Sequence, residues 1–336
     1  MAKTKNNARW EDIVAAVAGS QRVLLVWHIR PDGDSVASAM AVARALRKMG
    51  KQALVVCPDT VPENLLFIAP PSEWARPEEV VGNFDHAVFL DCAGLDRIGP
   101  AQSLVENVGR IVNIDHHESN QRFGDLNYVD PGAAACVELA HRLIRDLGLE
   151  IDPQMATALY TGLTTDTGSF RFENTRAETL RFAADLVAGG ANPALIGRQI
   201  WDNRTPGTLR LLHAALGTVG IDPSGRLAWI EVTAAMIAES AALPEDAEGL
   251  VEYPRSLRGV DIAVLFAVQE PGAVRCSLRG TSKVDVSLLA AQFGGGGHPR
   301  AAGCTIHDDW PRARELVLDS ARKALEALPA EGDAAR

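Results

Sequence analysis

The sequence predicts an α/β protein with two domains: a first domain built on a parallel sheet with flanking helices, linked to a smaller second domain with a mixed sheet. In the first half of the chain, short apolar runs alternate with helical patterns, which is typical of parallel sheets. Runs such as VLLVW (23–27) and AVFL (87–90) are apolar without interruption, as expected for strands covered on both faces. A length of 336 residues also favours two domains over one.

The predicted elements of the first domain alternate along the chain. Strands are expected at residues 22–28, 52–58, 86–92 and 110–117. Helices are expected where small and apolar residues recur at helical spacing, at residues 35–50, 137–148 and 152–166. Ligands of parallel sheets gather at the carboxyl ends of the strands, so polar residues at these ends are candidates for a functional site.

From about Arg176 the pattern changes and a second set of elements begins. Helices are expected at residues 179–190, 193–201 and 205–219, and the last of these would connect the domains. The second domain is expected to contain strands at 226–233, 260–269 and 273–280 and helices at 234–241, 283–293 and 310–328. We therefore expect a first domain at residues 1–190, a helical linker at 191–217, a second domain at 218–330 and a disordered tail at 331–336.

Composition restricts the environment and the partners of the protein. The net charge of −10, from 43 acidic and 33 basic residues, argues against long nucleic acid as a partner, because such proteins usually present a basic surface. No apolar run is long enough to span a membrane, and the polar N-terminus lacks the apolar segment of a secretory signal. The five cysteines form no CxxC pair, so we expect reduced thiols in the cytoplasm, without a zinc knuckle or a disulfide framework.

Acidic and imidazole side chains occur at four places in the first half, each at the end of a predicted strand or beside a polar loop. HIRPDGDS follows the first strand, LDCAG ends the third, IDHH ends the fourth, and TTDTGSF leaves a helix. The residues concerned are His28, Asp32, Asp34, Asp91, Asp115, His116, His117 and Asp166. The ends of parallel strands lie side by side, so these groups can converge, and their carboxylates would repel one another unless cations lay between them.

The types of side chain indicate which cations would fit. Aspartate and histidine without cysteine suit a hard to borderline divalent ion, with manganese or magnesium ahead of structural zinc. The set is larger than one ion needs, and two ions about 3.5–4 Å apart that share a carboxylate are an arrangement that hydrolyses phosphoesters. The helix starting near Ser35 would also direct its N-terminus at this place, which favours an anion there.

Each fragment taken alone has a plainer interpretation. An aspartate at a strand end is often a helix cap or a turn residue, and adjacent histidines can simply be solvated. Four such fragments in one α/β half favour a metal centre instead.

Two motifs in the second half carry groups that suit phosphates. On the predicted strand 273–280, alternation places Arg275, Ser277 and Arg279 on one face, where guanidinium groups could bind phosphate oxygens bidentately; the alternative is a solvated edge face. FGGGGHPRAAGC (293–304) offers backbone N–H groups to an anion, or is a plain flexible turn. It lacks the Lys-Ser/Thr of a P-loop, and no GxGxxG follows a strand, so ATP and NAD motifs are not supported.

Taken in order, HIRPDGDS, LDCAG, IDHH and TTDTGSFRF resemble the four motifs of the DHH phosphoesterases, a family named after the Asp-His-His that here is residues 115–117. Together with FGGGGHPRAAGC they make the chain similar, from about Arg22 to about Leu325, to the NrnA-like subgroup. Members of that subgroup are bifunctional oligoribonucleases and 3′-phosphoadenosine 5′-phosphate phosphatases with a DHH-associated C-terminal domain.

The resemblance implies a role for each candidate residue. It implies that two cations are held by six side chains, with one bridging: His28 and Asp32 on the first, Asp34, His116 and Asp166 on the second, and Asp91 between them. His117 would face the substrate phosphate, and Asp115 would orient the histidines. Across a cleft between the two domains, the substrate would meet Arg275, Ser277, Arg279, Gly295, Gly296, Gly297 and His298, with Arg300 a weaker candidate.

The implied activity is hydrolysis of short RNA oligonucleotides, of linear or cyclic dinucleotides, or of 3′-phosphoadenosine 5′-phosphate, by a water activated between two manganese or magnesium ions. A manganese pyrophosphatase and a catalytically silent nucleotide sensor are the alternatives. The match around RFEN and GGGGHP disfavours the first, and the complete ligand set disfavours the second. A homodimer is a further expectation from the family. Phe170 is assigned to the core, and Phe172 is left open between core packing and base stacking.

Overall fold

The computed structural model describes residues 6–106, 108–270 and 272–328, and the chain divides into two compact units between Asn203 and Arg204. This division falls inside the predicted linker, residues 191–217, although the domain limits themselves remain predictions. The predicted tail, residues 331–336, lies outside the described residues. None of the described helices is both long and apolar enough to cross a membrane.

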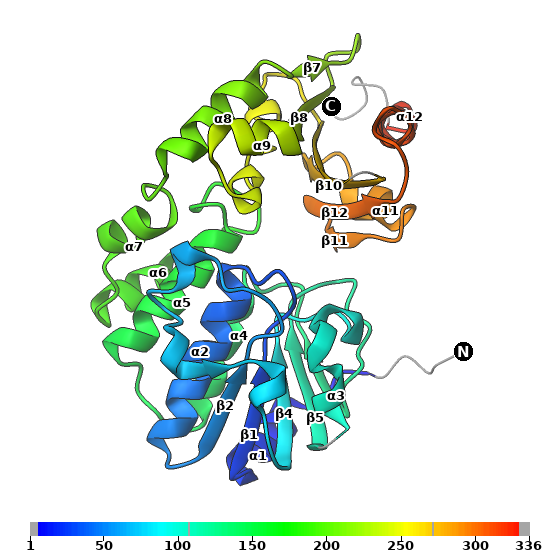
Figure 1. Ribbon diagram of the computed structural model, residues 1–336. Helices are drawn as coiled ribbons and strands as arrows, with labels where there is room; N and C mark the ends of the chain where they lie inside the picture. The colour runs from blue at the N-terminus through cyan, green and yellow to red at the C-terminus, as the bar shows by residue number, and fades with distance from the viewer. Residues whose placement is uncertain (1–5, 107, 271, 329–336) are drawn as a thin grey trace, which may run out of the picture. The chain divides into compact units, whose positions relative to one another are not determined.

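The first unit is built on a six-stranded sheet in which every strand runs parallel to its neighbours (Figure 1). The strands are β1 (Arg22–Val26), β2 (Gln52–Val56), β3 (Trp74–Ala75), β4 (Phe84–Leu90), β5 (Val108–Asp115) and β6 (Leu126–Val129). Their order is β3-β2-β1-β4-β5-β6, so the direction of winding reverses between β1 and β4. The crevice outside the carboxyl ends at such a reversal is where open α/β sheets bind ligands.

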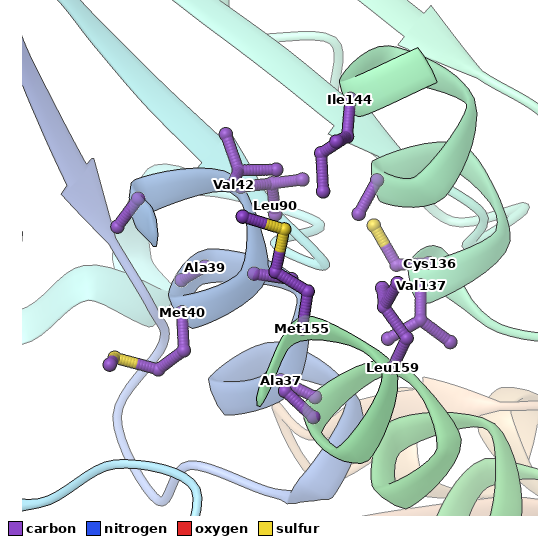
Figure 2. Close-up of a cluster of buried hydrophobic side chains, with 14 of the residues drawn as sticks. Ala37, Ala39, Met40, Val42, Leu90, Cys136, Val137, Ile144, Met155 and Leu159 are labelled. Carbon is purple, nitrogen blue, oxygen red and sulfur yellow. The ribbon is translucent and has the colours of Figure 1, made fainter. Parts of the chain in front are cut away.

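Helices cover both faces of this sheet. The helical elements of the first unit are α1 (Trp10–Gly19), α2 (Gly33–Lys48), η4 (Leu95–Ala101), α3 (Gln102–Val105), α4 (Cys136–Asp146), α5 (Pro153–Asp166), α6 (Ala177–Ala188) and α7 (Pro193–Ile200), with the short 3-10 turns η1 (Glu63–Leu65), η2 (Pro71–Glu73) and η3 (Pro77–Glu79). The main core lies between the sheet and α2, α4 and α5, and Val137 of α4 lies beside Leu159 of α5 within it (Figure 2). A second core on the opposite face includes Ile98 and Ala101 of η4.

These two cores explain the uninterrupted apolar strands. On β1, Val23 and Leu25 belong to the main core, whereas Leu24 and Val26 belong to the second, and all four are fully buried. The predicted parallel sheet, buried on both faces, is therefore confirmed.

The second unit contains a six-stranded mixed sheet of order β11-β12-β10-β9-β8-β7, in which β8 and β9 are parallel and the other described pairs are antiparallel. Its strands are β7 (Gly220–Ile221), β8 (Leu227–Thr233), β9 (Ile262–Glu270), β10 (Ala273–Gly280), β11 (Gly296–His298) and β12 (Ala301–Ile306). Its helical elements are α8 (Pro206–Leu216), α9 (Ala234–Ser240), η5 (Pro244–Ala247), α10 (Glu252–Arg255), α11 (Val286–Ala291) and α12 (Trp310–Glu326). α11 and α12 pack on one face, and α8 and α10 pack on the other against β8 and β9. The predicted mixed sheet is confirmed.

The predicted strands and helices agree with the structure to within a few residues at each end. Several shorter elements were not predicted: the helices α1, α3 and α10, the 3-10 turns, and the strands β3, β6, β7, β11 and β12. One prediction needs correction, because the glycine-rich stretch is not simply a loop. Residues Gly296–His298 form β11, which pairs antiparallel with β12 and places these glycines at the edge of the sheet. Glycines carry no side-chain alternation, so the strand left no pattern in the sequence.

Candidate active site

The eight acidic and imidazole residues singled out in the first half lie together in the first unit. They are positioned by the carboxyl ends of β1, β4 and β5, by the first turn of α2 and by the last turn of α5. They are His28, Asp32, Asp34, Asp91, Asp115, His116, His117 and Asp166. β1 and β4 are the strands between which the winding reverses, so the fold places these residues at the ligand-binding crevice of the sheet.

A first group consists of His28, Asp32 and Asp91. The Nε2 atom of His28 lies 3.6 Å from Oδ2 of Asp32 and 3.7 Å from Oδ2 of Asp91. On the other side of the ring, Nδ1 lies 2.9 Å from the backbone oxygen of Ile29. If Nδ1 carries the proton and donates it to that oxygen, the lone pair of Nε2 faces the two carboxylates, as it would in a metal ligand.

A second group consists of Asp34, His116 and Asp166. The Nε2 atom of His116 lies 3.8 Å from Oδ2 of Asp34 and 3.7 Å from Oδ2 of Asp166. Asp34 is held by the N-terminus of α4, since its two carboxylate oxygens accept hydrogen bonds from the backbone N–H of Cys136 at 2.5 Å and of Val137 at 2.9 Å. Two of the N–H groups that a helix start leaves without an intrahelical partner are thereby satisfied, and the carboxylate is fixed in orientation.

Asp91 lies between the two groups. Its Oδ2 faces His28, and its Oδ1 lies 3.4 Å from Nε2 of His116 and accepts no hydrogen bond within the described residues. These separations are too long for hydrogen bonds, but two ligands held at about 2.1 Å from one ion lie roughly 3.0–4.2 Å apart. The side chains therefore fit two divalent cations with Asp91 shared between them.

The electrostatics agree with a site that binds positive charge. Burial, followed by the charges of Asp91 and Asp166, raises the pKa of Asp34 well above its ordinary value. Burial also raises the pKa of Asp166, to about 7. Burial alone would lower the pKa of His28, but the charges of Asp32 and Asp91 raise it to about 10. A cluster of carboxylates with this much mutual repulsion favours the binding of cations between them.

Asp115 supports the histidines that follow it. Its Oδ1 accepts hydrogen bonds from the backbone N–H of His116 at 2.7 Å, from the backbone N–H of His117 at 3.3 Å, and lies 2.7 Å from Nδ1 of His117. Its Oδ2 accepts a hydrogen bond from Nδ2 of Asn120 at 2.5 Å. With both oxygens so occupied, this fully buried carboxylate orients the imidazole of His117.

Comparison with known proteins gives the same architecture. Residues 22–163 match the model of the DHH family, N-terminal domain, and residues 231–329 match that of the DHHA1 domain. The chain is 35% identical over 315 residues to the bifunctional oligoribonuclease and PAP phosphatase NrnA of Thermus thermophilus, an alignment that covers 94% of this chain and 93% of that protein. The chain belongs to the DHH family.

Two further similarities extend over most of the chain. A bifunctional oligoribonuclease and PAP phosphatase NrnA of Bacillus subtilis is 24% identical over 311 residues, covering 92% of this chain and 96% of that protein. The crystal structure of an exopolyphosphatase-related protein from Bacteroides fragilis superposes with a TM-score of 0.86 at 24% identity, covering 93% of this chain and 95% of the other, and this likeness bears on the fold alone. As a DHH protein similar to NrnA, the chain is a hydrolase of phosphoester bonds.

Backbone strain in this DHH protein is concentrated near the site. Asp91 has a φ of 59° and Arg30 a φ of 54°, and the segment after α5 places Gly168, Ser169 and Phe170 in succession at 55°, 60° and 62°. Residues other than glycine rarely adopt the left-handed region, and they keep it where the surrounding structure imposes it, often at functional sites.

A glycine between two site aspartates has a steric reason. A Cβ atom on Gly33 would overlap the side chain of Thr165, coming within 2.7 Å of its Cγ2. Gly33 thus lets the start of α2, with Asp34, approach the end of α5, with Asp166.

The predicted substrate-binding residues of the second half lie in the second unit. On β10, Val274, Cys276 and Leu278 are buried, and Arg275, Ser277 and Arg279 share the opposite, half-buried face, as predicted from alternation. Two glutamates pair with these arginines: Nη2 of Arg275 lies 3.0 Å from Glu248, and Nε of Arg279 lies 3.0 Å from Glu252.

The glycine stretch divides between a turn and a strand. Gly295 precedes β11, and Gly296, Gly297 and His298 form it. Arg300, the weaker candidate, donates hydrogen bonds to the backbone oxygens of Val284 and Ser282 at 2.9 and 3.0 Å, which gives it a structural task in its own unit.

The two phenylalanines of TTDTGSFRF lie in the first unit. Phe170 packs against the main core and forms an edge-to-face contact with Tyr160, so its assignment to the core is confirmed. The ring of Phe172 lies against Gly168.

Sequence reasoning missed the residues that hold the site in place. The N–H groups of Cys136 and Val137, which hold Asp34, leave no trace in a side-chain pattern. Asn120 could have been suspected, because it follows the Asp-His-His motif by three residues, but nothing in its spacing shows that it binds Asp115.

Proposed function

We propose that this protein uses two divalent cations, manganese by preference, to hydrolyse short oligoribonucleotides and to remove a phosphate from 3′-phosphoadenosine 5′-phosphate. One observation carries the proposal: two groups of ligands, most of them buried, share the carboxylate of Asp91 at the switch point of the sheet. The substrate class rests on the relatives, since the proteins from Thermus thermophilus and Bacillus subtilis both carry these two activities in their names.

We assign the first cation to His28 and Asp32, the second to Asp34, His116 and Asp166, and a bridging position to Asp91. When bound, such a pair of cations supplies an activated water and neutralises charge that builds on the phosphoryl oxygens. The protein's own contribution is to fix the ligands. The α4 N-terminus holds Asp34, and the backbone oxygen of Ile29 orients His28.

His117 has a different task from its neighbour. Its Nδ1 lies 2.7 Å from Oδ1 of Asp115, a contact that fixes the orientation of the ring. We propose that this imidazole donates a hydrogen bond to the phosphoryl group, which helps to orient it for attack. Asp115 has no direct part in the reaction and acts through His117.

For the second unit, we propose that Arg275, Ser277 and Arg279 hold a phosphate at the far end of the substrate, together with Gly295, Gly296, Gly297 and His298. An anion would have to replace Glu248 and Glu252 as the partners of the two arginines. Short substrates agree with the acidic net charge, because proteins that bind long nucleic acid usually present a basic surface. The buried, reduced cysteines agree with a cytoplasmic location.

The test is a substrate panel. Purified protein is incubated with an RNA dinucleotide, an RNA of at least about 20 nucleotides, 3′-phosphoadenosine 5′-phosphate and inorganic pyrophosphate, each with manganese, with magnesium and with EDTA. We expect manganese-dependent hydrolysis of the dinucleotide and of 3′-phosphoadenosine 5′-phosphate, and little turnover of the long RNA. Faster hydrolysis of pyrophosphate, or activity that survives EDTA, would contradict the proposal.

A further inference from the structure

An arginine outside the predicted ligand set contacts the first group. Arg97, in η4, places Nη2 3.2 Å from Nδ1 of His28. Nδ1 is the ring atom on the side away from the two carboxylates, so the guanidinium lies beside the group and not among its ligands. A permanently charged guanidinium cannot itself bind a metal.

The backbone around Arg97 is fixed against the segment that carries His28. The carbonyl oxygen of Arg97 accepts a hydrogen bond from the N–H of Ile29 at 2.7 Å. The next residue, Ile98, is fully buried in the second core. Gly99 follows with a φ of 47°, and a Cβ atom there would come within 2.7 Å of the side chain of Ile29. The position of Arg97 is therefore set by packing and hydrogen bonds on both sides of it.

The contact with His28 does not give the guanidinium of Arg97 a hydrogen-bond acceptor. If Nδ1 of His28 donates its proton to the oxygen of Ile29, it has no lone pair left for Arg97 to use. Within the part of the chain that the structure describes, Arg97 forms no ion pair and no second side-chain hydrogen bond. Its neighbours His28 and Ile29 thus hold a partly buried cation in place without supplying an anionic partner.

The substrate can supply that partner. A guanidinium binds phosphoryl oxygens through two parallel hydrogen bonds, and a fixed donor placed where negative charge builds lowers the barrier to hydrolysis. We propose that Arg97 binds the scissile phosphoryl group beside the first group of ligands. This inference rests on the proposed function, because it assumes that a phosphoester is hydrolysed at this site.

The test uses the full-length protein in three variants. Arg97→Met removes the charge and the donors, and Arg97→Lys keeps a charge without the planar fork. Arg181→Met is the control, since Arg181 is an exposed arginine of the same unit that pairs with the nearby Glu178. Steady-state kinetics on an RNA dinucleotide gives kcat and KM, and manganese titration gives the affinity for the cation. Methylguanidinium is added to ask whether the missing group can be replaced.

We expect R97M to lose about 100-fold in kcat/KM, R97K to lose about 10-fold and R181M to stay within threefold of wild type. Manganese affinity should change less than threefold in all of them. Methylguanidinium should raise the activity of R97M several-fold and leave R181M unchanged, a response that a purely structural arginine would not show.

Three results would overturn the assignment: wild-type kinetics in R97M, full activity in R97K, or a loss of activity in both that follows a loss of manganese affinity, since Arg97 would then act only on His28. If R97M fails to fold, R97K and its manganese titration still decide. A wild-type protein that does not hydrolyse the dinucleotide with manganese would instead refute the proposed function.

Discussion

At the scale of single residues, Asp91 is the side chain on which both groups of ligands depend. Replacement by asparagine is the sharpest test, because asparagine keeps the shape of the side chain and tolerates the left-handed φ of 59° at this position. We expect Asp91→Asn to lower kcat by at least about 1,000-fold, since in the proposed function this ligand would hold both cations that stabilise charge in the transition state. Kinetics with saturating manganese measures the loss.

The same variant separates a role in metal binding from a role in folding. Asp91→Asn should still fold, whereas bound manganese should fall below two ions per chain. Asp319→Asn, which changes an exposed aspartate of the second unit, is the matched control and should retain both ions. Two tightly bound ions in Asp91→Asn would remove Asp91 from the bridging position.

Asn120 gives a prediction about support rather than direct contact. Its Nδ2 donates to Oδ2 of Asp115 at 2.5 Å and lies 2.9 Å from the side-chain oxygen of Asn113. Asn120→Ala should lower activity about 10- to 100-fold, as is usual when a residue behind the ligands is lost, and should destabilise the fold by about 1–3 kcal/mol. Kinetics and urea unfolding measure the two effects. The control Gln121→Ala, one residue further along, should change neither the activity nor the stability. If Asn120→Ala also changed neither, Asp115 would not need the hydrogen bond from Asn120.

At the scale of elements, the site depends on how closely α2 approaches α5. Gly33 lies at the start of α2, where an added methyl group would overlap Thr165 near the end of α5. Gly33→Ala should therefore destabilise the fold by about 1–3 kcal/mol and weaken manganese binding, because Asp34 and Asp166 are carried by these two helix ends. Calorimetry and manganese titration are the measurements.

Two further variants give this prediction its controls. Gly19→Ala adds the same methyl group at the end of α1, where nothing lies within 4 Å, and should be neutral. Thr165→Ala removes two of the three atoms that the new methyl group would meet and leaves Cβ at 2.9 Å. The double variant Gly33→Ala/Thr165→Ala should therefore recover part of the stability and manganese affinity that Gly33→Ala loses. If Gly33→Ala binds manganese as well as wild type, the close approach of the helices is not what sets the site.

How far the elements could be predicted depended on the signal that each one leaves in the sequence. The strand VLLVW was evident because both of its faces are buried, whereas β6 has only four residues of mixed polarity and β11 is mostly glycine. The site aspartates and histidines were predicted because they follow strands or lie beside polar loops, and they do lie together. Arg97 was not predicted as a site residue. It lies near His28 because the backbone of Ile29 is hydrogen-bonded to that of Arg97, and these residues are 68 positions apart in the sequence.

At the scale of the whole molecule, the metal-free site should influence the stability of the fold. Asp34 and Asp166 have raised pKa values through burial, so the folded protein binds protons that the unfolded chain has released. Stability of the metal-free protein therefore falls as pH rises from the ordinary aspartate value of 3.8 through about 7. The pKa of His28 is raised from 6.5 to about 10, so its stabilising effect is complete below 6.5 and is lost as pH rises through 10.

Between about pH 6 and about pH 8, the aspartates and His28 both make the metal-free protein less stable as pH rises. Bound cations should oppose this loss, because a ligand must be deprotonated to bind a metal and the cation therefore binds more tightly at higher pH. We expect the difference in Tm between manganese-saturated and EDTA-treated protein to grow as pH rises over this interval, and manganese binding to release protons into the buffer. Thermal unfolding at a series of pH values measures the first effect, and titration in buffers of different ionisation enthalpy measures the second. Asp91→Asn should show a much smaller difference in Tm at every pH. A difference that stayed constant or shrank with rising pH would mean that the buried carboxylates of Asp34 and Asp166 do not exchange protons for cations.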